Sequence, residues 1–389
     1  MKRIADCSVN GCSVCPDERF SKTIMAQSQC NIENRLGPLL AMIPALAVGI
    51  CFCLILAFLL NIEPGDMLAA IWIGAWGGAN EAAATLNKMT PLLLTGLAVS
   101  VAYQAGLLNI GCEGQLTLGA LTAAVFALGA APLPWPLAMP LTVLAGALVG
   151  ALWAFPAIWL RNSRGIHEVI STLLLNYVAI YLADFLVRGP LGDGTSMART
   201  AEIPSAGIWP NWWNLGTFGV TAAPLAALLL SCILHLWRYQ TYWGYEATAC
   251  GNNPVAAKAA GIAVGRRQAW NFLLSGALAG VAGALEVVAT HHRFYAAFSP
   301  GYGFDGITVA FLVNNVPGWT WLSSLLLASL RSADKWLQIS LGISPNTIIV
   351  LQAVLLISVA CQAGFRLPLS FGLGRLLERL QRHSNHREL

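Results

Sequence analysis

The chain has 389 residues, of which 57% are hydrophobic and only 10% are charged, and its formal net charge is +4. Soluble globular domains carry about 25% charged residues, so this composition excludes two or three water-soluble domains and favours one membrane domain. The basic residues fall in short clusters between apolar runs, which indicates membrane topology and no nucleic-acid partner.

The first 38 residues are predicted to form a cytoplasmic tail. They contain Cys7, Cys12, Cys15 and Cys30. The last of these is too far along the chain for a compact zinc site, so we expect reduced thiols, with a bound metal as the alternative. The apolar run 39–60 begins too late and is too long for a signal peptide, and we expect it to be a membrane anchor.

About 20 apolar residues are needed for a helix that crosses the hydrocarbon core. The runs that best fit this requirement are 39–60, 135–160, 168–187, 218–237 and 269–290, and weaker runs are 89–105, 114–131 and 347–363. The region 66–88 is more polar and rich in tryptophan, so we expect it at the outer interface. The run 299–332 is interrupted at Asn314–Gly318, which predicts two short helices.

Charge predicts the orientation of these spans. Sixteen of the 22 Lys and Arg residues lie in four segments, 1–38, 161–168, 238–268 and 364–389. An excess of basic residues is typical of cytoplasmic loops. Only ten spans, not nine, place the basic C-terminal tail inside. We therefore predict an all-α polytopic membrane protein with about ten transmembrane helices, both termini cytoplasmic, and a permease domain over 39–363.

Signals for enzyme chemistry are weak. The chain has no Gly-Lys pair and hence no G-x-x-x-x-G-K-[ST] phosphate loop. Residues 301–306 match G-x-G-x-x-G by letters only, because a membrane helix follows them. His167-Glu168 lacks the second histidine of a zinc helix, since position 171 is serine. We expect no catalytic residue, no cofactor and no metal.

Polar residues within the apolar runs are the strongest functional signal, because such residues are costly at membrane depth and often mark transport pathways. Glycines at 106, 111 and 114 allow the chain to unwind around the first of them. The alternative for each is hydrogen bonding between helices or capping. The predicted substrate-pathway residues are Asn109, Glu113, Gln115, Glu168, Ser171, Asn176, Asn271 and Asp305.

One cytoplasmic segment, 244–262, is predicted to contain a short helix. Asn253 before Pro254 is a typical helix start and Gly261 a typical stop. A short helix rich in alanine buries little, so it is either a surface connector or a docking helix for a soluble partner. The residues assigned to that docking role are Gly244, Gly251, Asn253, Pro254, Ala256, Ala257, Ala260 and Gly261.

The sequence from about 85 to 363 resembles the membrane permeases of bacterial ATP-binding-cassette (ABC) importers for simple sugars, nucleosides and branched-chain amino acids. The motif Asn-Ile-Gly-x-Glu-Gly-Gln is similar to the nucleoside-type branch. The segments that carry the resemblance are Thr90–Leu97, Gly106–Gln115, His167–Tyr177, Gly251–Pro254 with Gly261–Ile262, and Gly303–Gly306.

This resemblance implies about ten helices in the bacterial inner membrane. It also implies a cytoplasmic ATP-binding subunit, a second and different permease subunit, and an extracytoplasmic solute-binding protein, with no nucleic acid involved. The segment 244–262 would be the coupling helix that docks on the ATPase. The chain departs from the family at Thr248 and Ala249, where an arginine is usual.

Two other classes of function remain as alternatives. An ion-gradient-driven secondary transporter would need ligands for a coupling ion, and Glu113 is the one residue that could serve. A membrane enzyme or scaffold is the second alternative. The absence of a nucleophile–base pair in the sequence argues against the enzyme.

Overall fold

The computed structural model describes residues 42–130, 133–215 and 218–344, together with positions 346, 349, 350, 353, 354, 357 and 358. The predicted tails 1–38 and 364–389, the four N-terminal cysteines and most of the predicted span 347–363 lie outside the described residues. The statements that follow concern the described part of the chain.

Helices make up nearly all of this part. In chain order, the long elements are a first helix Met42–Leu59, α2 (Pro64–Trp76), α3 (Ala79–Gln104), α4 (Cys112–Gly129), α5 (Trp135–Arg164), α6 (Glu168–Arg188), α7 (Ala223–Gln240), α8 (Tyr242–Asn252), α9 (Pro254–Ala259), α10 (Val264–Glu286), α11 (Tyr302–Leu312) and α12 (Thr320–Leu341). The short elements are η1 (Ser205–Gly207), the π-helical turn η2 (Val287–His291), η3 (Pro317–Trp319), and the antiparallel strands β1 (Asn211–Leu215) and β2 (Phe218–Thr221).

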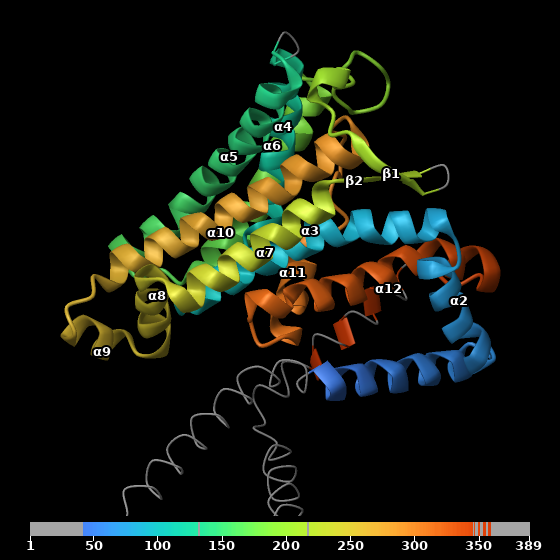
Figure 1. Ribbon diagram of the computed structural model, residues 1–389, viewed down its shortest axis with the longest axis horizontal. Helices are drawn as coiled ribbons and strands as arrows, with labels where there is room; N and C mark the ends of the chain where they lie inside the picture. The colour runs from blue at the N-terminus through green and yellow to red at the C-terminus, as the bar shows by residue number, and fades with distance from the viewer. Residues whose placement is uncertain are drawn as a thin grey trace, which may run out of the picture.

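The helix α10 lies at the centre of the bundle and packs on α3, α4 and α5 (Figure 1). Small residues allow this close packing. A Cβ added at Gly119 of α4 would lie 2.6 Å from the Cα of Gly280 in α10. One added at Gly146 of α5 would lie 2.8 Å from the Cβ of Ala284. Gly146 with Gly150 in α5, and Gly276 with Gly280 in α10, are pairs of small residues four apart, and both pairs lie at this contact. Such spacing is typical of close helix contacts in membranes.

Five of the described helices are long and apolar enough to cross a membrane: Met42–Leu59, Cys112–Gly129, Trp135–Arg164, Glu168–Arg188 and Val264–His291. Each overlaps a predicted span, which supports a helical membrane protein. The count of ten spans and the orientation of the termini stay predictions.

Two helix starts and one region differ from those expected. The helix α3 begins at Ala79, ten residues before the predicted span at 89, because the polar stretch before it continues the same helix. The region 66–88 was expected at the interface, but most of α2 lies within it and this helix packs on α12. The helix α7 begins at Ala223, since residues 218–221 form the strand β2.

The predicted division of 299–332 into two helices is confirmed. The first part is α11, and the second is α12, which continues to Leu341. Between them, Asn314 and Asn315 have φ values of 51° and 57°. Asparagine tolerates this left-handed region better than most residues, so the turn forms where the apolar pattern breaks.

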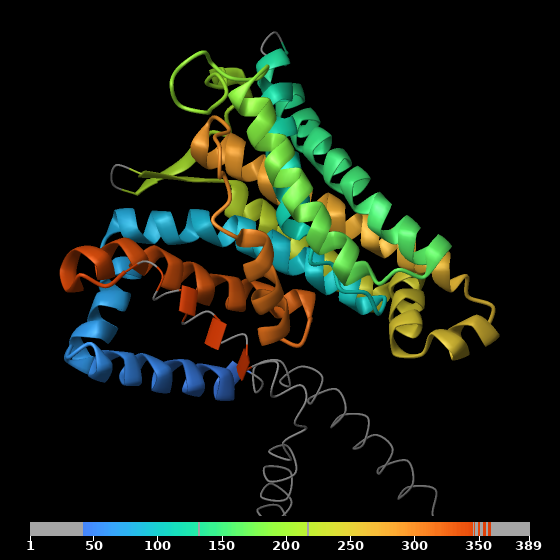
Figure 2. The same ribbon diagram turned by 180° about the vertical axis from the view of Figure 1, so that it is seen from behind.

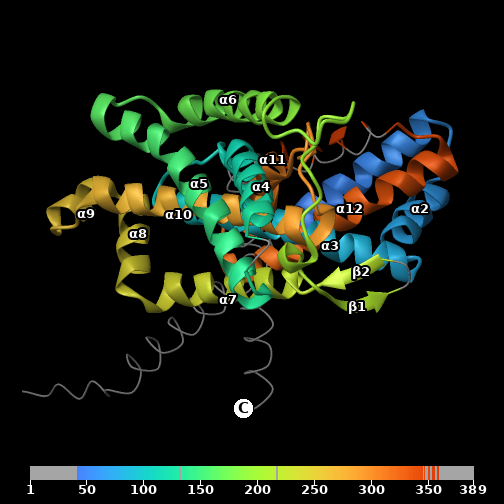
Figure 3. The same ribbon diagram turned by 90° about the horizontal axis from the view of Figure 1, so that it is seen from above.

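The two ends of the bundle carry different structures. The helices α8 and α9 lie together at one end, and the hairpin β1–β2 lies at the other (Figures 1 and 2). Viewed from above, α6 and α7 lie on opposite sides of α4, α5 and α10 (Figure 3). The segment assigned to partner docking is therefore far from the loops that connect α6 to α7.

Candidate functional site

Residues 105–111 form a break between α3 and α4 in which the backbone leaves the helical path. Gly106 has a φ of 76°, which glycine adopts at little cost. Side chains from other helices satisfy the exposed carbonyls. Gln268 of α10 donates to the carbonyl of Ala105 at 3.0 Å, and Asn176 of α6 donates to the carbonyl of Ile110 at 2.8 Å. The break is thus closed by protein hydrogen bonds, as buried backbone groups require.

Asn109 lies at the centre of this break and is fully buried. Its amide nitrogen donates to Gln115 Oε1 at 2.8 Å and to Ser275 Oγ at 2.9 Å. Its oxygen accepts from the N–H of Gly111 at 2.9 Å and from Gln115 Nε2 at 3.3 Å. The pair Asn109–Gln115 therefore links the break to α4 and, through Ser275, to α10.

The helix α6 supplies the other side of the break. The oxygen of Asn176 accepts from the N–H of Gly114 at 2.9 Å, within the first turn of α4. Glu168 is buried, forms an ion pair with Arg161, and accepts from the N–H of Leu108 at 3.4 Å. Two of the predicted pathway residues in α6 thus hold the backbone of the break in place.

Glu113 points from the first turn of α4 to the beginning of α11. Its Oε2 accepts from the N–H of Gly303 at 2.7 Å. A carboxylate at this position satisfies an N–H group that has no partner within α11 and interacts favourably with the helix dipole. The approach is close, because a Cβ added at Gly303 would lie 2.7 Å from the carbonyl carbon of Cys112. Glu113 therefore joins the start of α4 to the start of α11.

The start of α11 is also held from α12 and α3. Arg331 forms an ion pair with Asp305, in the first turn of α11, and donates to the carbonyl of Pro300 at 3.2 Å. Lys88 of α3 donates to the carbonyl of Arg331 at 2.8 Å. Asp305 is therefore paired with α12, and it lies with Glu113 at the start of α11.

The last two predicted pathway residues stand apart. Ser171 donates only within its own helix, to the carbonyl of His167 at 3.4 Å. Asn271 donates to the carbonyl of Arg267, and its Oδ1 is buried without a hydrogen-bond donor among the described residues. The structure thus brings Asn109, Gln115, Glu168 and Asn176 together at the break, and Glu113 and Asp305 at the start of α11. Their contact with a solute stays a prediction.

The docking segment consists of two helices, α8 and α9. Asn253 caps α9, because its side chain accepts from the N–H groups of Val255 and Ala256 at 3.1 and 3.0 Å. Gly261 follows with a φ of 86°, so the predicted start and stop signals are confirmed. The residues of this set with exposed surfaces are Asn253, Pro254, Ala256, Ala260 and Gly261, whereas Gly244 and Ala257 are buried and Gly251 is half-buried.

The helix α8 is packed directly on the break. The N–H nitrogen of Gly106 would lie 3.0 Å from a Cβ added at Gly251, which leaves space for glycine alone. Gln104 donates from the end of α3 to the carbonyl of Gly244 at 3.1 Å and to Thr248 Oγ1 at 3.0 Å. The docking segment and the polar break are therefore neighbours, which the linear sequence does not reveal.

Comparison with known proteins then decides the family. Residues 81–360 match the family described as the permease component of the branched-chain amino acid transport system. The chain belongs to this family. The match covers most of the region in which the sequence motifs predict the resemblance, and it makes the chain a multi-pass membrane permease that works with ATP-binding and substrate-binding components.

Several relatives of this permease are similar over most of their length. The glucose ABC transporter permease protein TsgB13 of Haloferax volcanii is 33% identical over 85% of this chain and 88% of its own. The guanosine ABC transporter permease protein NupP of Bacillus subtilis is 32% identical over 89% and 97%. The nucleoside ABC transporter permease protein NupB of Lactococcus lactis is 29% identical over 85% and 92%. All three relatives are named as permease proteins.

Some residues that build the site of this permease were missed from sequence. Ser275, Gln268 and Gln104 complete the hydrogen bonds of the break, but single serines and glutamines are common at helix contacts and ends. Arg331 gave a clearer signal, since it directly follows the mostly apolar run 325–330 of α12, where a charged side chain requires a partner. Among the described residues, no three His, Cys, Asp or Glu side chains gather as metal ligands.

Proposed function

We propose that this permease is the membrane subunit of an ABC importer that carries a nucleoside or a simple sugar across the bacterial inner membrane. The support is its similarity, over more than four fifths of the chain, to permease proteins named for guanosine, nucleosides and glucose. The permease itself provides the pathway, and ATP is hydrolysed on a cytoplasmic subunit.

The assembly we propose has a second, different permease subunit and an extracytoplasmic solute-binding protein. In it, this chain spans the lipid bilayer with about ten helices and keeps both termini in the cytoplasm. Support comes from the distribution of basic residues and from the separation of α8–α9 from the outer loops (Figure 1). The solute-binding protein would meet the end that carries β1–β2.

The contact between α8 and the polar break carries this proposal. An importer of this kind must transmit movement from a cytoplasmic ATPase to a pathway within the membrane. Gly251 lies against Gly106, and Gln104 bonds to the backbone of α8. A displacement of α8–α9 by the ATPase would therefore act on the break with no flexible linker between them.

The predicted pathway residues would take part in transport by exchanging hydrogen bonds within the protein for hydrogen bonds to the solute. In the structure, Asn109, Gln115, Glu168 and Asn176 bond to one another's segments and to the break, while Glu113 and Asp305 bond at the start of α11. Among the described residues, the side chains of Ser171 and Asn271 donate only within their own helices. When the break moves, these buried groups would offer their hydrogen bonds to a polar solute.

The test replaces Ala256 and Ala260, on the exposed surface of α9, with phenylalanine in the assembled importer. We expect ATP hydrolysis to continue while solute uptake falls at least fivefold, because bulk at this surface displaces the docked ATPase. The matched control is Ala69→Phe, on an exposed position of α2. Normal uptake by the α9 variants would contradict the docking role.

The same assay separates the proposal from an ion-gradient-driven secondary transporter. We expect uptake to stop when ATP is depleted and to persist when an uncoupler abolishes the proton gradient while ATP is maintained. The reverse pattern would overturn the importer. No similarity found for this chain favours that alternative.

A further inference from the structure

The outer end of α10 contains a carboxylate–imidazole pair that the pathway prediction does not use. After Glu286 the chain continues as the π-helical turn η2, Val287–His291. A π-helix bonds each residue to the fifth along, so it places residues five apart on one face. His291 Nε2 accordingly lies 3.2 Å from Glu286 Oε1. In a regular α-helix, with 3.6 residues per turn, these two residues would point in different directions.

A third polar group meets the same imidazole nitrogen. The hydroxyl of Tyr295 lies 3.4 Å from His291 Nε2. A single ring nitrogen either donates a hydrogen bond or accepts one, and it does not do both at once. Glu286 and Tyr295 therefore compete for His291, and one of the two is left with a hydrogen bond to give or receive.

The other carboxylate oxygen of Glu286, Oε2, is the second notable feature of the site. Its side chain is only 3% exposed. Its Oε2 accepts no hydrogen bond from any described residue. A buried carboxylate oxygen without a donor is costly, and π-helical turns are frequent at functional sites. These two independent features point to a ligand that supplies the missing donor.

The aromatic rings around this pair restrict the kind of ligand. His291 meets the rings of Tyr295 and Phe298 edge to face, with centroids 5.2 and 5.4 Å apart. Phe298 is also stacked on Phe294 at 5.0 Å. Phe294 and Phe298 are buried, so their faces are closed to the C–H face of a sugar. The polar edges of Glu286, His291 and Tyr295 remain.

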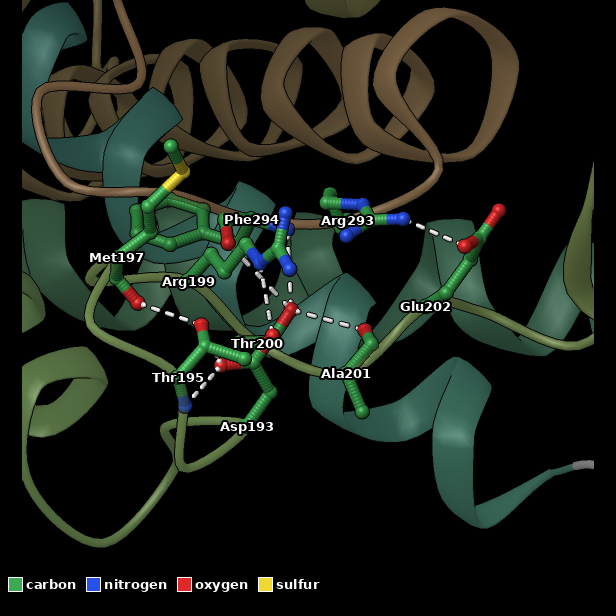
Figure 4. Close-up of polar contacts among 9 residues, drawn as sticks. All are labelled: Asp193, Thr195, Met197, Arg199, Thr200, Ala201, Glu202, Arg293 and Phe294. Carbon is green, nitrogen blue, oxygen red and sulfur yellow. Dashed lines mark hydrogen bonds and ion pairs between the residues drawn. The ribbon is translucent and has the colours of Figure 1, made fainter.

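The site lies toward the end of the bundle that would receive solute from outside. The segment after His291 is fixed to the loop that follows α6 (Figure 4). Thr200 donates its N–H to the carbonyl of Phe294 at 2.8 Å, and Arg293 forms an ion pair with Glu202. The side chain of His291 keeps 32% of its surface exposed, so the site can be approached from its side.

We propose that Glu286, His291 and Tyr295 bind the hydrogen-bonding edge of a planar nitrogen heterocycle, the base of a nucleoside. Glu286 Oε2 accepts an N–H of the base, while His291 and Tyr295 contact its neighbouring polar atoms. Carboxylates and ring edges recognise bases in this way in proteins that bind them outside a duplex. The inference rests on the proposed importer function and specifies its substrate class.

The test measures guanosine uptake by the assembled importer carrying Glu286→Gln, which keeps the side-chain shape but replaces an acceptor oxygen with a donor. We expect the KM for radiolabelled guanosine to rise at least tenfold with little change in maximal rate, because a hydrogen bond to a charged group is lost. The matched control is Glu63→Gln, on an exposed position before α2. Photolabelling with 8-azidoguanosine should modify residues within 286–298 in the wild-type permease.

The outcomes distinguish this inference from the proposed function. If ATP-dependent guanosine uptake is normal in Glu286→Gln, or if the photolabel lies elsewhere, the site is wrong and the importer stands. Uptake of radiolabelled glucose in place of guanosine also overturns the site. The absence of ATP-dependent uptake of both solutes contradicts the proposed function itself. Should Glu286→Gln fail to assemble, Tyr295→Phe, which removes only a hydroxyl, is expected to raise the KM at least threefold, and an unchanged KM would overturn the site.

Discussion

At the scale of single residues, buried amides and carboxylates in this permease hold the backbone in place, and we propose that they also contact the solute. Asn176 accepts from Gly114 and donates to Ile110, so it satisfies two backbone groups that the break exposes. Glu113 satisfies the N–H of Gly303 in the same way. A group that holds backbone in place is not excluded from the pathway, because the same hydrogen bonds become free when the backbone moves.

Glu113 allows these two uses to be separated by experiment. We predict that Glu113→Ala lowers uptake at least tenfold while the complex with the ATPase still assembles, because about 1–3 kcal/mol is lost when a buried group loses its partner. Glu113→Gln retains an oxygen that can accept from Gly303. If Glu113→Gln restores uptake, the role of Glu113 is to accept the hydrogen bond at the start of α11. If uptake stays low, the negative charge itself is required. Unchanged transport in Glu113→Ala would remove Glu113 from the pathway.

The predictability of these residues from sequence follows from their chemistry. Asn109, Glu113 and Gln115 were identified because polar side chains in an apolar run are costly. Their partners were not, because Ser275 and Gln268 are brought to the break by the packing of α10, and nothing in the local sequence encodes that contact. Asn271 shows the opposite case, a residue with the expected polarity that forms a hydrogen bond only within its own helix among the described residues.

At the scale of elements, close approach of small residues determines how the helices pack. In a membrane, helices associate through van der Waals contact and not through the hydrophobic effect, so small residues at the interface matter most. The glycines of α10 face both α4 and α5. The spacing of four residues made these contacts predictable, whereas the start of α3 at Ala79 and the strand β2 were not, because polar helix and hairpin residues there lack the apolar signal of a span.

We predict that Gly280→Ala destabilises the permease by about 1–3 kcal/mol, as overpacking of a close contact does. The added methyl group would meet the backbone of Gly146 and Gly150. The measurement is the midpoint of thermal aggregation in detergent. Gly265→Ala in the same helix is the control, because a Cβ there has no neighbour nearer than 3.9 Å. Equal midpoints for the two variants would contradict the packing role.

A second element, the loop that follows α6, depends on a carboxylate. The hydroxyl and the N–H of Thr195 donate to Asp193, which also pairs with Arg199, and these contacts lower the pKa of Asp193 to about 2 (Figure 4). A lowered pKa means that the carboxylate stabilises the folded loop at every pH above its ordinary pKa of about 3.9. That stabilisation declines as the pH falls from about 4 and is lost below about 2.

We therefore predict that Asp193→Asn increases amide hydrogen exchange in residues 193–203 at pH 7, and that wild-type exchange, corrected for its intrinsic rate, shows no such loosening between pH 7 and 5. The measurement is hydrogen exchange followed by mass spectrometry. Asp184→Asn is the control, because its partner Arg188 lies on the surface of α6. Loosening of the wild-type loop already between pH 7 and 5 would contradict the assignment.

At the scale of the whole molecule, the fold connects two regions that are 140 residues apart in sequence. The end of α3 and the break contact α8 through Gln104, Gly106 and Gly251. On the other side, α8 is tied to the start of α10 by the buried ion pair of Glu246 with Arg267. The docking segment is thus fixed to two helices that border the break, α3 and α10.

This arrangement leads to a prediction about coupling. In Gly251→Ala the added Cβ meets the N–H nitrogen of Gly106 at 3.0 Å and overlaps the carbonyl of Gln104, so α8 must shift away from the break. We expect the ATPase to bind and hydrolyse ATP at near-normal rates while uptake of the transported solute falls at least fivefold, because movement of α8 no longer reaches the break. The control is Asn252→Ala, the adjacent exposed residue of α8. Parallel loss of ATP hydrolysis and uptake would instead mean that Gly251 serves assembly, and normal uptake would mean that force reaches the pathway by another route.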